Sequence, residues 1–357
     1  MTGVIDSMNV VIGSNHLWQD FAKVGLHAFG KHLFEKGHKI EWFTISFSPL
    51  LFLKPTHVAT KWAKLMMAIR PQRFTSLNGG ILINRTLFPP VHPVNFPFLN
   101  SYYVAKNYLN WALPSPHWIL RRDSALPIDL LLFDSGGIAL FHPLHRSAQL
   151  TIYRLNDFVA EFPGQVRGKA KCETEVIRKT DIVLAVSQSL YEEAVKIRGT
   201  AKGVYLLPNG VDTKPFGVAW PEPPEYKEIP RPRAIYVGTM ASWFDWEFLV
   251  KVAAMCPFVS FILVGRGSPP APLPQNVYLL GAYPPERIPA FVQHADVGLI
   301  IFKDLPIIAR IEKPLKFYEY LAAGLPVVSV SYGHQQRLGE EGGFHGEEGP
   351  KAPSPQG

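Results

Sequence analysis

The sequence predicts an α/β protein built from two Rossmann-like domains that face a cleft. Apolar runs typical of buried parallel strands alternate with helical stretches, and this alternation starts afresh after a proline-rich segment near the middle of the chain. The 357 residues are 47% apolar and include only two cysteines, which is enough for two cores and excludes a disulfide scaffold or a disordered polymer.

We predict the first domain over residues 1–213. A short β-branched run, a stretch with helical spacing that ends at Gly37, and an alternating run give a strand–helix–strand opening. Further apolar runs continue the sheet toward the middle of the chain. The predicted strands are 9–14, 39–47, 129–134, 150–154 and 181–187, and the predicted helices are 18–36 and 166–179.

Residues 214–232 contain six prolines, counting both ends, and we expect them to form a stiff interdomain linker. The second domain is predicted over 233–330. Residues 331–357 are poor in apolar side chains, so we expect a disordered or aberrant tail after an incomplete second domain. The predicted strands of that domain are 233–238, 259–265, 277–281, 296–302 and 325–330, and its helices are 246–254, 285–294 and 313–323.

Charge is concentrated in the first third of the chain. Residues 1–122 hold 13 Lys and Arg against 4 Asp and Glu, whereas the remainder has 23 against 25. The stretch 50–74 alternates cations such as Lys61 and Lys64 with Trp, Leu and Met and has no acid, which suits a surface that meets anionic lipid head groups. An ordinary helix with its apolar side in the core is an equal alternative, and no motif favours nucleic acid.

Neither a membrane span nor secretion is expected. No run of about 18 apolar residues lacks charges, and Asp6 precedes the first strand without a basic head. We therefore expect a cytoplasmic protein, peripheral on the inner face of the plasma membrane. Cys172 and Cys256 are far apart and no HExxH or HxH cluster occurs, so two reduced thiols and no metal site are expected.

Lys316 and Glu319 are the first candidate ligand-binding pair. They share one face near the start of a predicted helix, where a cation and the helix dipole suit a diphosphate and a carboxylate suits a ribose diol. Spacing alone would favour a surface ion pair. The whole segment 313–328, KPLKFYEYLAAGLPVV, nevertheless closely resembles the donor-binding helix of GT-B glycosyltransferases.

Gly238, Thr239 and Met240 follow a predicted strand and form the complementary donor-side candidate. A glycine at the carboxyl end of a Rossmann strand lets the backbone approach phosphate closely. Glycine ends many strands, so this signal is weak by itself, but it matches the position expected in the GT-B family.

Asp157 is the candidate general base, because it follows a strand and would lie at the edge of the sheet that faces the cleft. Helix capping is the alternative for a lone aspartate. Its surroundings resemble those of bacterial exopolysaccharide glucuronosyltransferases, from about Val10 to Val328 and weakly between Ser48 and Ile128. The matching blocks are 133–136, 153–157, Glu173 with Glu175, and 186–187.

This resemblance implies a metal-independent, inverting hexosyl- or glucuronosyltransferase with Asp157 as base. The first domain would hold a lipid-linked or polysaccharide acceptor, and the second a nucleotide-sugar, expected to be UDP-linked, with Lys316 neutralising the leaving group. Ser14, Asn15 and His16 occupy the acceptor-side position of the cleft, although His16 is equally explained as a plain loop histidine.

The segment departs from two family patterns. Retaining GT-B enzymes carry a glutamate eight residues before the position of Glu319, where this chain has Ile311, with Glu312 one step away, and this departure favours inversion. The family's C-terminal segment has no counterpart after Val330, which puts stability and activity in doubt. The alternatives are a retaining transferase or a sugar-nucleotide epimerase of the same fold, and a truncated non-catalytic chain.

Overall fold

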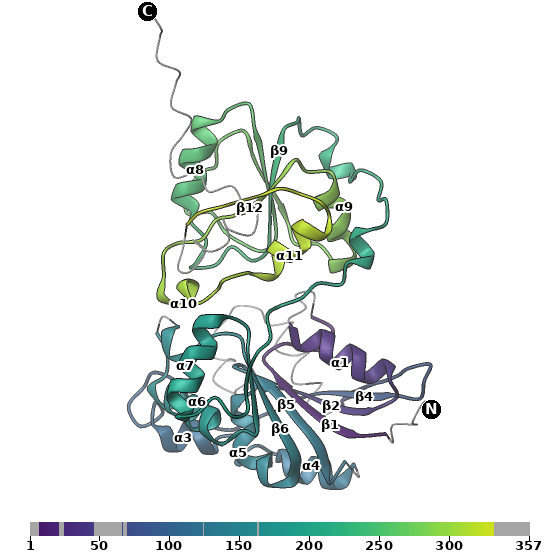
Figure 1. Cartoon of the computed structure of the whole chain (residues 1–357), viewed down its shortest axis with the longest axis vertical. Helices are drawn as coiled ribbons and strands as arrows, with labels where there is room; N and C mark the ends of the chain where they lie inside the picture. Colours follow the sequence, from purple (N-terminus) through teal and green to yellow (C-terminus); the bar gives the residue numbers. More distant parts are fainter. Residues whose placement is uncertain are drawn as a thin grey trace, which may run out of the picture. The chain divides into compact units, whose positions relative to one another are not determined.

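A computed structural model divides the chain into two compact units, residues 1–209 and 210–357 (Figure 1). The structure describes residues 7–20, 25–45, 66, 70–123, 125–162 and 164–331. Most of the basic stretch 50–74, including Lys61 and Lys64, lies outside the described residues, as does nearly all of the predicted tail.

The first unit contains an eight-stranded sheet of order β3-β4-β2-β1-β5-β6-β7-β8. All neighbours pair in parallel except β3, which runs antiparallel to β4 at the edge. The strands are β1 (Asn9–Ser14), β2 (Lys39–Thr44), β3 (Gln72–Thr75), β4 (Ile81–Thr86), β5 (Ile128–Asp134), β6 (Ala148–Leu155), β7 (Ile182–Ala185) and β8 (Val204–Leu206).

Helices cover both faces of this sheet (Figure 1). Helix α1 (Gly25–Glu35) packs Leu26 against one face, where Ile12 and Trp42 are fully buried. The other face, which carries Phe43, Leu131 and Tyr153, packs against the remaining helices in the largest core cluster. These helices are α3 (Tyr102–Asn107), α4 (Pro116–Arg122), α5 (Phe141–Leu144), α6 (Arg167–Lys179) and α7 (Gln188–Arg198).

The second unit is a five-stranded parallel sheet of order β11-β10-β9-β12-β13. Its strands are short apolar runs, and β9 and β10 are buried along their whole length, as expected for the centre of a covered parallel sheet. The elements are β9 (Arg233–Val237), α8 (Trp246–Met255), β10 (Ser260–Val264), β11 (Val277–Gly281), α9 (Ile288–Gln293), β12 (Val297–Ile300), α10 (Pro306–Ala309), α11 (Leu315–Ala322) and β13 (Val327–Ser329).

The α/β class and the restart of the pattern are confirmed, and most differences concern element ends. The helix predicted from Trp18 begins, among the described residues, at Gly25, because Trp18 lies in a turn. The sequence did not predict β3, β4, α3, α4, α5, α7, β8 and α10.

The proline-rich segment 214–232 packs as part of the second unit. Tyr226 is fully buried and its hydroxyl donates to the carbonyl oxygen of Phe291 at 2.9 Å. The Arg233 guanidinium donates to the carbonyl oxygens of Tyr226 and Ile229 at 2.9 and 2.6 Å. The unit boundary lies after Asn209, so the segment we expected to be a linker is fixed to the second sheet.

Among the described residues, no helix is both long enough and apolar enough to cross a bilayer.

Candidate active site

Three neighbouring strands of the first unit end in polar residues at one edge of the sheet. Strands β1, β5 and β6 are adjacent and parallel, so Ser14, Asp134 and Arg154 come together where these strands end. Asp134 and Arg154 are direct cross-strand partners. The carboxyl edge of a parallel sheet is where ligands bind in open α/β folds.

Asp134 is a buried acid held by hydrogen bonds from two segments. The Ser14 hydroxyl donates to its Oδ2 at 3.3 Å, and the Gly137 backbone N–H donates to its Oδ1 at 3.1 Å. Burial raises the pKa of Asp134 to about 6, against the opposing effects of His16 and these hydrogen bonds. Ser14 is itself fully buried, and its hydroxyl contacts Asp134 and the His16 backbone N–H.

Arg154 is a buried cation with unused hydrogen-bond donors. Its Nη2 donates to Asn209 Oδ1 at 3.0 Å and its guanidinium lies 5.2 Å from the Phe29 ring centroid. Its Nε and Nη1 are buried without a hydrogen-bond partner among the described residues. Burial lowers the pKa of Arg154, while Asp134 acts in the opposite direction.

Asp157 lies in the loop directly after β6, two residues beyond Leu155. The residue is half-buried, and no hydrogen bond or ion pair joins its carboxylate to the described part of the chain. Burial raises the pKa of Asp157 to about 6. A carboxylate with a raised pKa that is still below neutral pH is suited to accept a proton from a hydroxyl.

Glu173 fixes the loop that carries Asp157. It comes from helix α6, is fully buried, and accepts the Val159 backbone N–H at 2.8 Å on Oε2. Its Oε1 lies 2.7 Å from the Tyr153 hydroxyl. Burial raises the pKa of Glu173 to about 8, and the nearby charge of Asp157 adds to this shift. At neutral pH Glu173 is therefore mainly the neutral acid, which leaves Asp157 as the ionised carboxylate of the two.

Glu175, two residues along the same helix, belongs to a different environment. It pairs with Lys179 at 2.6 Å and Lys106 at 3.2 Å and is hydrogen-bonded to Tyr102. Burial acts to raise its pKa, but these partners hold that pKa well below its usual range. Of the two glutamates singled out in the sequence, only Glu173 lies beside Asp157.

Of the predicted acceptor-side residues, Asn15 is exposed and His16 is partly exposed. The His16 Nδ1 lies 3.6 Å from Asp20 Oδ2, which is an ion pair when the ring is protonated. The His16 backbone N–H also donates to Ser14 Oγ at 3.3 Å. Asn15 and His16 are thus the accessible members of the trio, while Ser14 supports Asp134.

The second unit builds a different edge from glycine, aromatic rings and a lysine. Gly238 follows β9 with φ +136°, and Gly265 follows β10 with φ +153°, a backbone region that favours glycine. A Cβ atom on Gly265 would lie 1.9 Å from the Gly238 carbonyl oxygen. The two strand ends therefore approach each other in a way that side chains would prevent.

Lys316 lies directly against Gly238. A Cβ atom on Gly238 would be 3.0 Å from the Lys316 Nζ, which lies 3.7 Å from the Tyr236 ring centroid and 4.9 Å from that of Phe302. Burial lowers the pKa of Lys316 to about 7, although Glu319 opposes this shift. Aromatic faces favour the charged form, but they do not replace the hydration that the ammonium group has lost.

Tyr320 holds the helix that carries Lys316. Its hydroxyl accepts the backbone N–H of Val237 at 2.9 Å and lies 3.3 Å from the Ile235 carbonyl oxygen, so helix α11 is joined to strand β9. Gly298 makes room for the tyrosine ring, because a Cβ atom there would lie 2.4 Å from it. Lys316, one turn earlier, is thereby placed over the end of β9.

The other donor-side candidates differ in how far their side chains are exposed. Thr239 is exposed, whereas Met240 is 4% exposed and packs in the apolar core of the second unit. Lys316 and Glu319, both described and both half-buried, form no ion pair with each other. Burial raises the pKa of Glu319, with Lys316 opposing it. The surface ion pair that spacing alone favoured is therefore not present.

Within the described residues, no group of three or more His, Cys, Asp and Glu side chains could hold a metal ion. Cys172 is buried and Cys256 half-buried, and both are free thiols.

No family model matches the chain. A curated relative from Bacillus subtilis (strain 168), TuaH, named for a glycosyltransferase role in teichuronic acid biosynthesis, is 25% identical over 187 residues, 49% of this chain and 46% of the relative. The chain thus spans about half the length of that relative.

Solved structures with the same fold include sucrose-phosphate synthase from Thermosynechococcus elongatus, with a TM-score of 0.63 and 16% identity over 92% of this chain and 82% of that one. Anabaena HepE in complex with UDP has a TM-score of 0.56 and 13% identity, again over 92% of this chain and 82% of that one. HepE has also been solved with UDP-glucose. These likenesses show that the fold is that of GT-B glycosyltransferases.

The more specific resemblance, to the exopolysaccharide glucuronosyltransferase GumK, stays a prediction.

Tyr236, Phe302 and Tyr320 were not singled out from the sequence. An aromatic residue inside the strand that precedes Gly238 was the available signal for Tyr236, but nothing in the sequence indicated that Phe302 would meet Lys316.

Proposed function

We propose that the protein is a glycosyltransferase that moves a sugar from a UDP-sugar to a hydroxyl of a lipid-linked or polysaccharide acceptor in cell-envelope synthesis. The fold, the UDP complexes of HepE and the named role of the Bacillus relative support this proposal. The second unit would bind the donor, and the first unit would supply the general base and the acceptor contacts.

The observation that carries the proposal is the position of Lys316 against Gly238. A diphosphate at the Gly238 backbone would meet the ammonium group and the first turn of α11, where backbone N–H groups favour an anion. Both would stabilise the negative charge that develops on UDP as the bond to the sugar breaks. Glu319, one turn on, is available to the ribose hydroxyls.

Asp157 would act on the acceptor. Its carboxylate would take the proton of the attacking hydroxyl, whose oxygen then forms the new bond to the anomeric carbon while UDP leaves from the opposite face. This sequence inverts the anomeric configuration. A pKa of about 6, and a neutral Glu173 beside it, keep Asp157 ionised at neutral pH.

The acceptor and the location are part of the same proposal. The excess of basic residues in the first 122 positions supports contact with an anionic membrane surface, where a lipid-linked acceptor would be found. Asn15 and His16 are the accessible side chains next to the Asp134 edge and are proposed acceptor contacts.

UDP binding tests this function. A ligand at a hundred times its dissociation constant stabilises a protein by about 2.7 kcal/mol, so saturating UDP should raise the melting temperature of the full chain by several degrees. An unchanged melting temperature would show that the donor site is not formed. The anomeric configuration of a transferred sugar then separates inversion from retention.

A further inference from the structure

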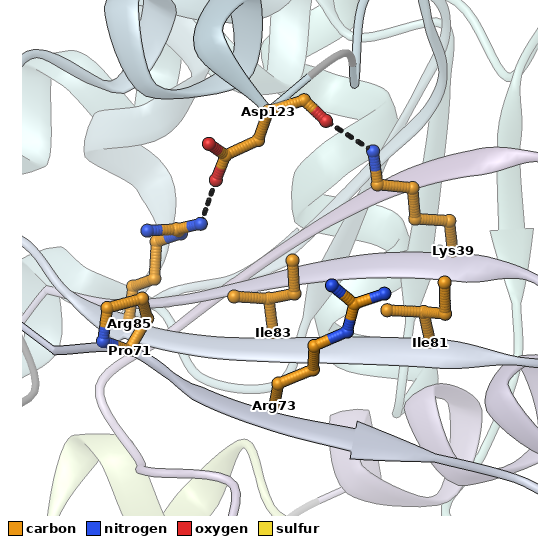
Figure 2. Close-up of a pocket in the computed structure, with 7 residues that line it drawn as sticks. All are labelled: Lys39, Pro71, Arg73, Ile81, Ile83, Arg85 and Asp123. Carbon is orange, nitrogen blue, oxygen red and sulfur yellow. Dashed lines mark hydrogen bonds and ion pairs between the residues drawn. The ribbon is translucent and has the colours of Figure 1, made fainter.

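A separate cavity of about 480 Å³ opens on the first unit, at the β3–β4 edge of the sheet. Strands β2 and β1 lie between β4 and the strand that carries Asp134, so the cavity does not belong to the candidate active site. Its size falls in the range of small-molecule pockets. It is lined by Lys39, Pro71, Arg73, Ile81, Ile83, Arg85 and Asp123 (Figure 2).

The floor of the cavity is one face of three neighbouring strands. Ile81, Ile83 and Arg85 alternate along β4, and so they point to the same face. Lys39 on β2 pairs with Ile81, and Arg73 on β3 pairs with Ile83. Lys39 and Arg73 therefore stand on opposite sides of an apolar strip, about 10 Å apart across the sheet, within the combined reach of their side chains.

The inner wall is fixed by ion pairs. The Arg85 guanidinium pairs with Asp123 and, at 2.9 Å, with the buried Glu41. Burial acts to raise the pKa of Asp123, but Arg122 and Arg85 hold that pKa below its usual value, so the carboxylate stays ionised. Lys39 Nζ donates to the Asp123 carbonyl oxygen at 2.6 Å. Figure 2 shows Arg85 and Lys39 reaching Asp123 from two sides.

Arg73 differs from Arg85 and Lys39. It is exposed, and no hydrogen bond or ion pair joins its guanidinium to the part of the chain that the structure describes. Figure 2 shows this guanidinium beside Ile81 and Ile83, within the space they line. Lys39 uses one hydrogen bond and retains two further N–H donors. Among the described residues, the lining thus has three cations against one carboxylate, and Arg73 and Lys39 retain N–H donors on two sides of the cavity.

We propose that this cavity binds a phosphate group attached to a small polyol, such as glycerol phosphate. The planar fork of an arginine matches two phosphate oxygens, and a lysine ammonium neutralises the remaining charge. The strip of Ile81, Ile83 and Pro71 would pack against the carbon chain, and the Asp123 carboxylate would accept a hydroxyl hydrogen. The same chemistry is offered by a free polyol phosphate and by a phospholipid head group. The proposal does not depend on the proposed transferase activity.

Two binding measurements on the full chain separate these sources. Isothermal calorimetry with glycerol 3-phosphate tests the free ligand, and co-sedimentation with phosphatidylglycerol vesicles, compared with phosphatidylcholine vesicles, tests the head group. Arg73→Ala should weaken whichever binding is seen by about tenfold or more, since a hydrogen bond between charged groups contributes roughly 1.5–3 kcal/mol. Arg73→Lys, which keeps the charge but loses the fork, should give an intermediate value.

Arg146→Ala is the matched control, because it removes another exposed arginine of the first unit, one that is not among the residues lining the cavity. Its binding should stay within twofold of wild type. Binding of glycerol 3-phosphate in solution would assign the site to a free polyol phosphate. Binding to phosphatidylglycerol vesicles only, lost in Arg73→Ala and kept in Arg146→Ala, would assign it to a lipid. Absence of both, or equal losses in the two variants, would overturn the proposal.

Discussion

The two units place different titratable groups where the parallel strands of their sheets end. The first unit gathers three carboxyl groups near Arg154, and burial raises their pKa values to about 6 for Asp134 and Asp157 and to about 8 for Glu173. The second unit presents Lys316 among aromatic rings, with Glu319 further along the same helix, and burial lowers the pKa of Lys316 to about 7.

This comparison shows how one physical effect, the loss of hydration on burial, can adapt an acid and an amine to two different roles. Burial disfavours the charged form of any group. It therefore raises the pKa of an acid and lowers the pKa of an amine, and both values move toward neutral pH. An acid prepared in this way can exchange a proton with a hydroxyl. An amine prepared in this way becomes fully charged when an anion binds beside it. This difference is why we propose proton transfer for the first unit and diphosphate binding for the second.

The largest effect is expected from Asp157→Asn, which keeps the shape of the side chain and removes its basicity. Turnover should fall by about 10² to 10⁴, the contribution typical of a general base. UDP affinity should be unchanged, because Asp157 belongs to the first unit. A transfer assay and a UDP titration of the same preparation check both statements. Unchanged turnover would remove Asp157 from the proposed role.

Lys316→Ala should weaken UDP binding by about ten- to a hundredfold, because it removes a charged hydrogen-bond donor from the diphosphate position. Lys227→Ala is the control, since it removes an exposed lysine of the same unit. Calorimetric titration with UDP measures the difference. Equal affinities in the two variants would count against a diphosphate at Gly238.

Tyr320→Phe should destabilise the second unit by about 1–3 kcal/mol, because the buried Val237 N–H then loses its acceptor. Helix α11 would also be free to shift, so UDP affinity should fall although no group of the proposed donor site is removed. Chemical denaturation and UDP titration measure the two effects. A stability within about 0.5 kcal/mol of wild type would show that Tyr320 does not position the helix.

The last comparison concerns pH and the first unit. Glu173 has a pKa of about 8 in the folded protein against 4.5 for an unperturbed glutamate, so the folded state keeps a proton that the unfolded state releases. The free energy of unfolding should therefore fall as pH rises between these values, by at most about 1.4 kcal/mol per pH unit.

Glu173→Gln should flatten this slope between pH 6 and 8. Glu175→Gln is the control on the same helix, because a lowered pKa contributes stability that is lost only as pH falls below about 4.5. Denaturation curves at several pH values measure the slopes. A wild-type slope that survives in Glu173→Gln would contradict the assignment of the neutral acid.

The sequence predicted the parts of the fold that depend on continuous apolar runs. Strand β1 and strand β11 have the predicted limits, because each is a short apolar run bounded by turn residues. The β3–β4 pair and helices α3 and α4 were missed, since residues 70–123 carry several prolines and no clear period. The pairing of β3 with β4 depends on the tertiary structure, because the local conformational preferences of these residues do not determine it.

For the candidate site too, the sequence indicated single residues but not the contacts between separate elements. Asp157, Lys316 and Gly238 could be singled out from the sequence because each follows a strand or begins a helix within a recognisable segment. The contact of Lys316 with Phe302 and the link between Glu173 and Val159 join residues from separate elements. Such contacts depend on how helices pack on a sheet, which the spacing of residues along the chain does not specify.

The most direct test of the account is a calorimetric titration of the full chain with UDP at pH 8 in two buffers of different ionisation enthalpy. With a pKa of about 7, Lys316 is mostly neutral at this pH and must gain a proton to pair with the diphosphate. We expect UDP to bind, and we expect the heats in the two buffers to differ. The heat difference, divided by the difference in ionisation enthalpy, should correspond to an uptake of close to one proton, and Lys316→Ala should remove this uptake. Absence of UDP binding, or the same proton uptake in Lys316→Ala, would contradict the account.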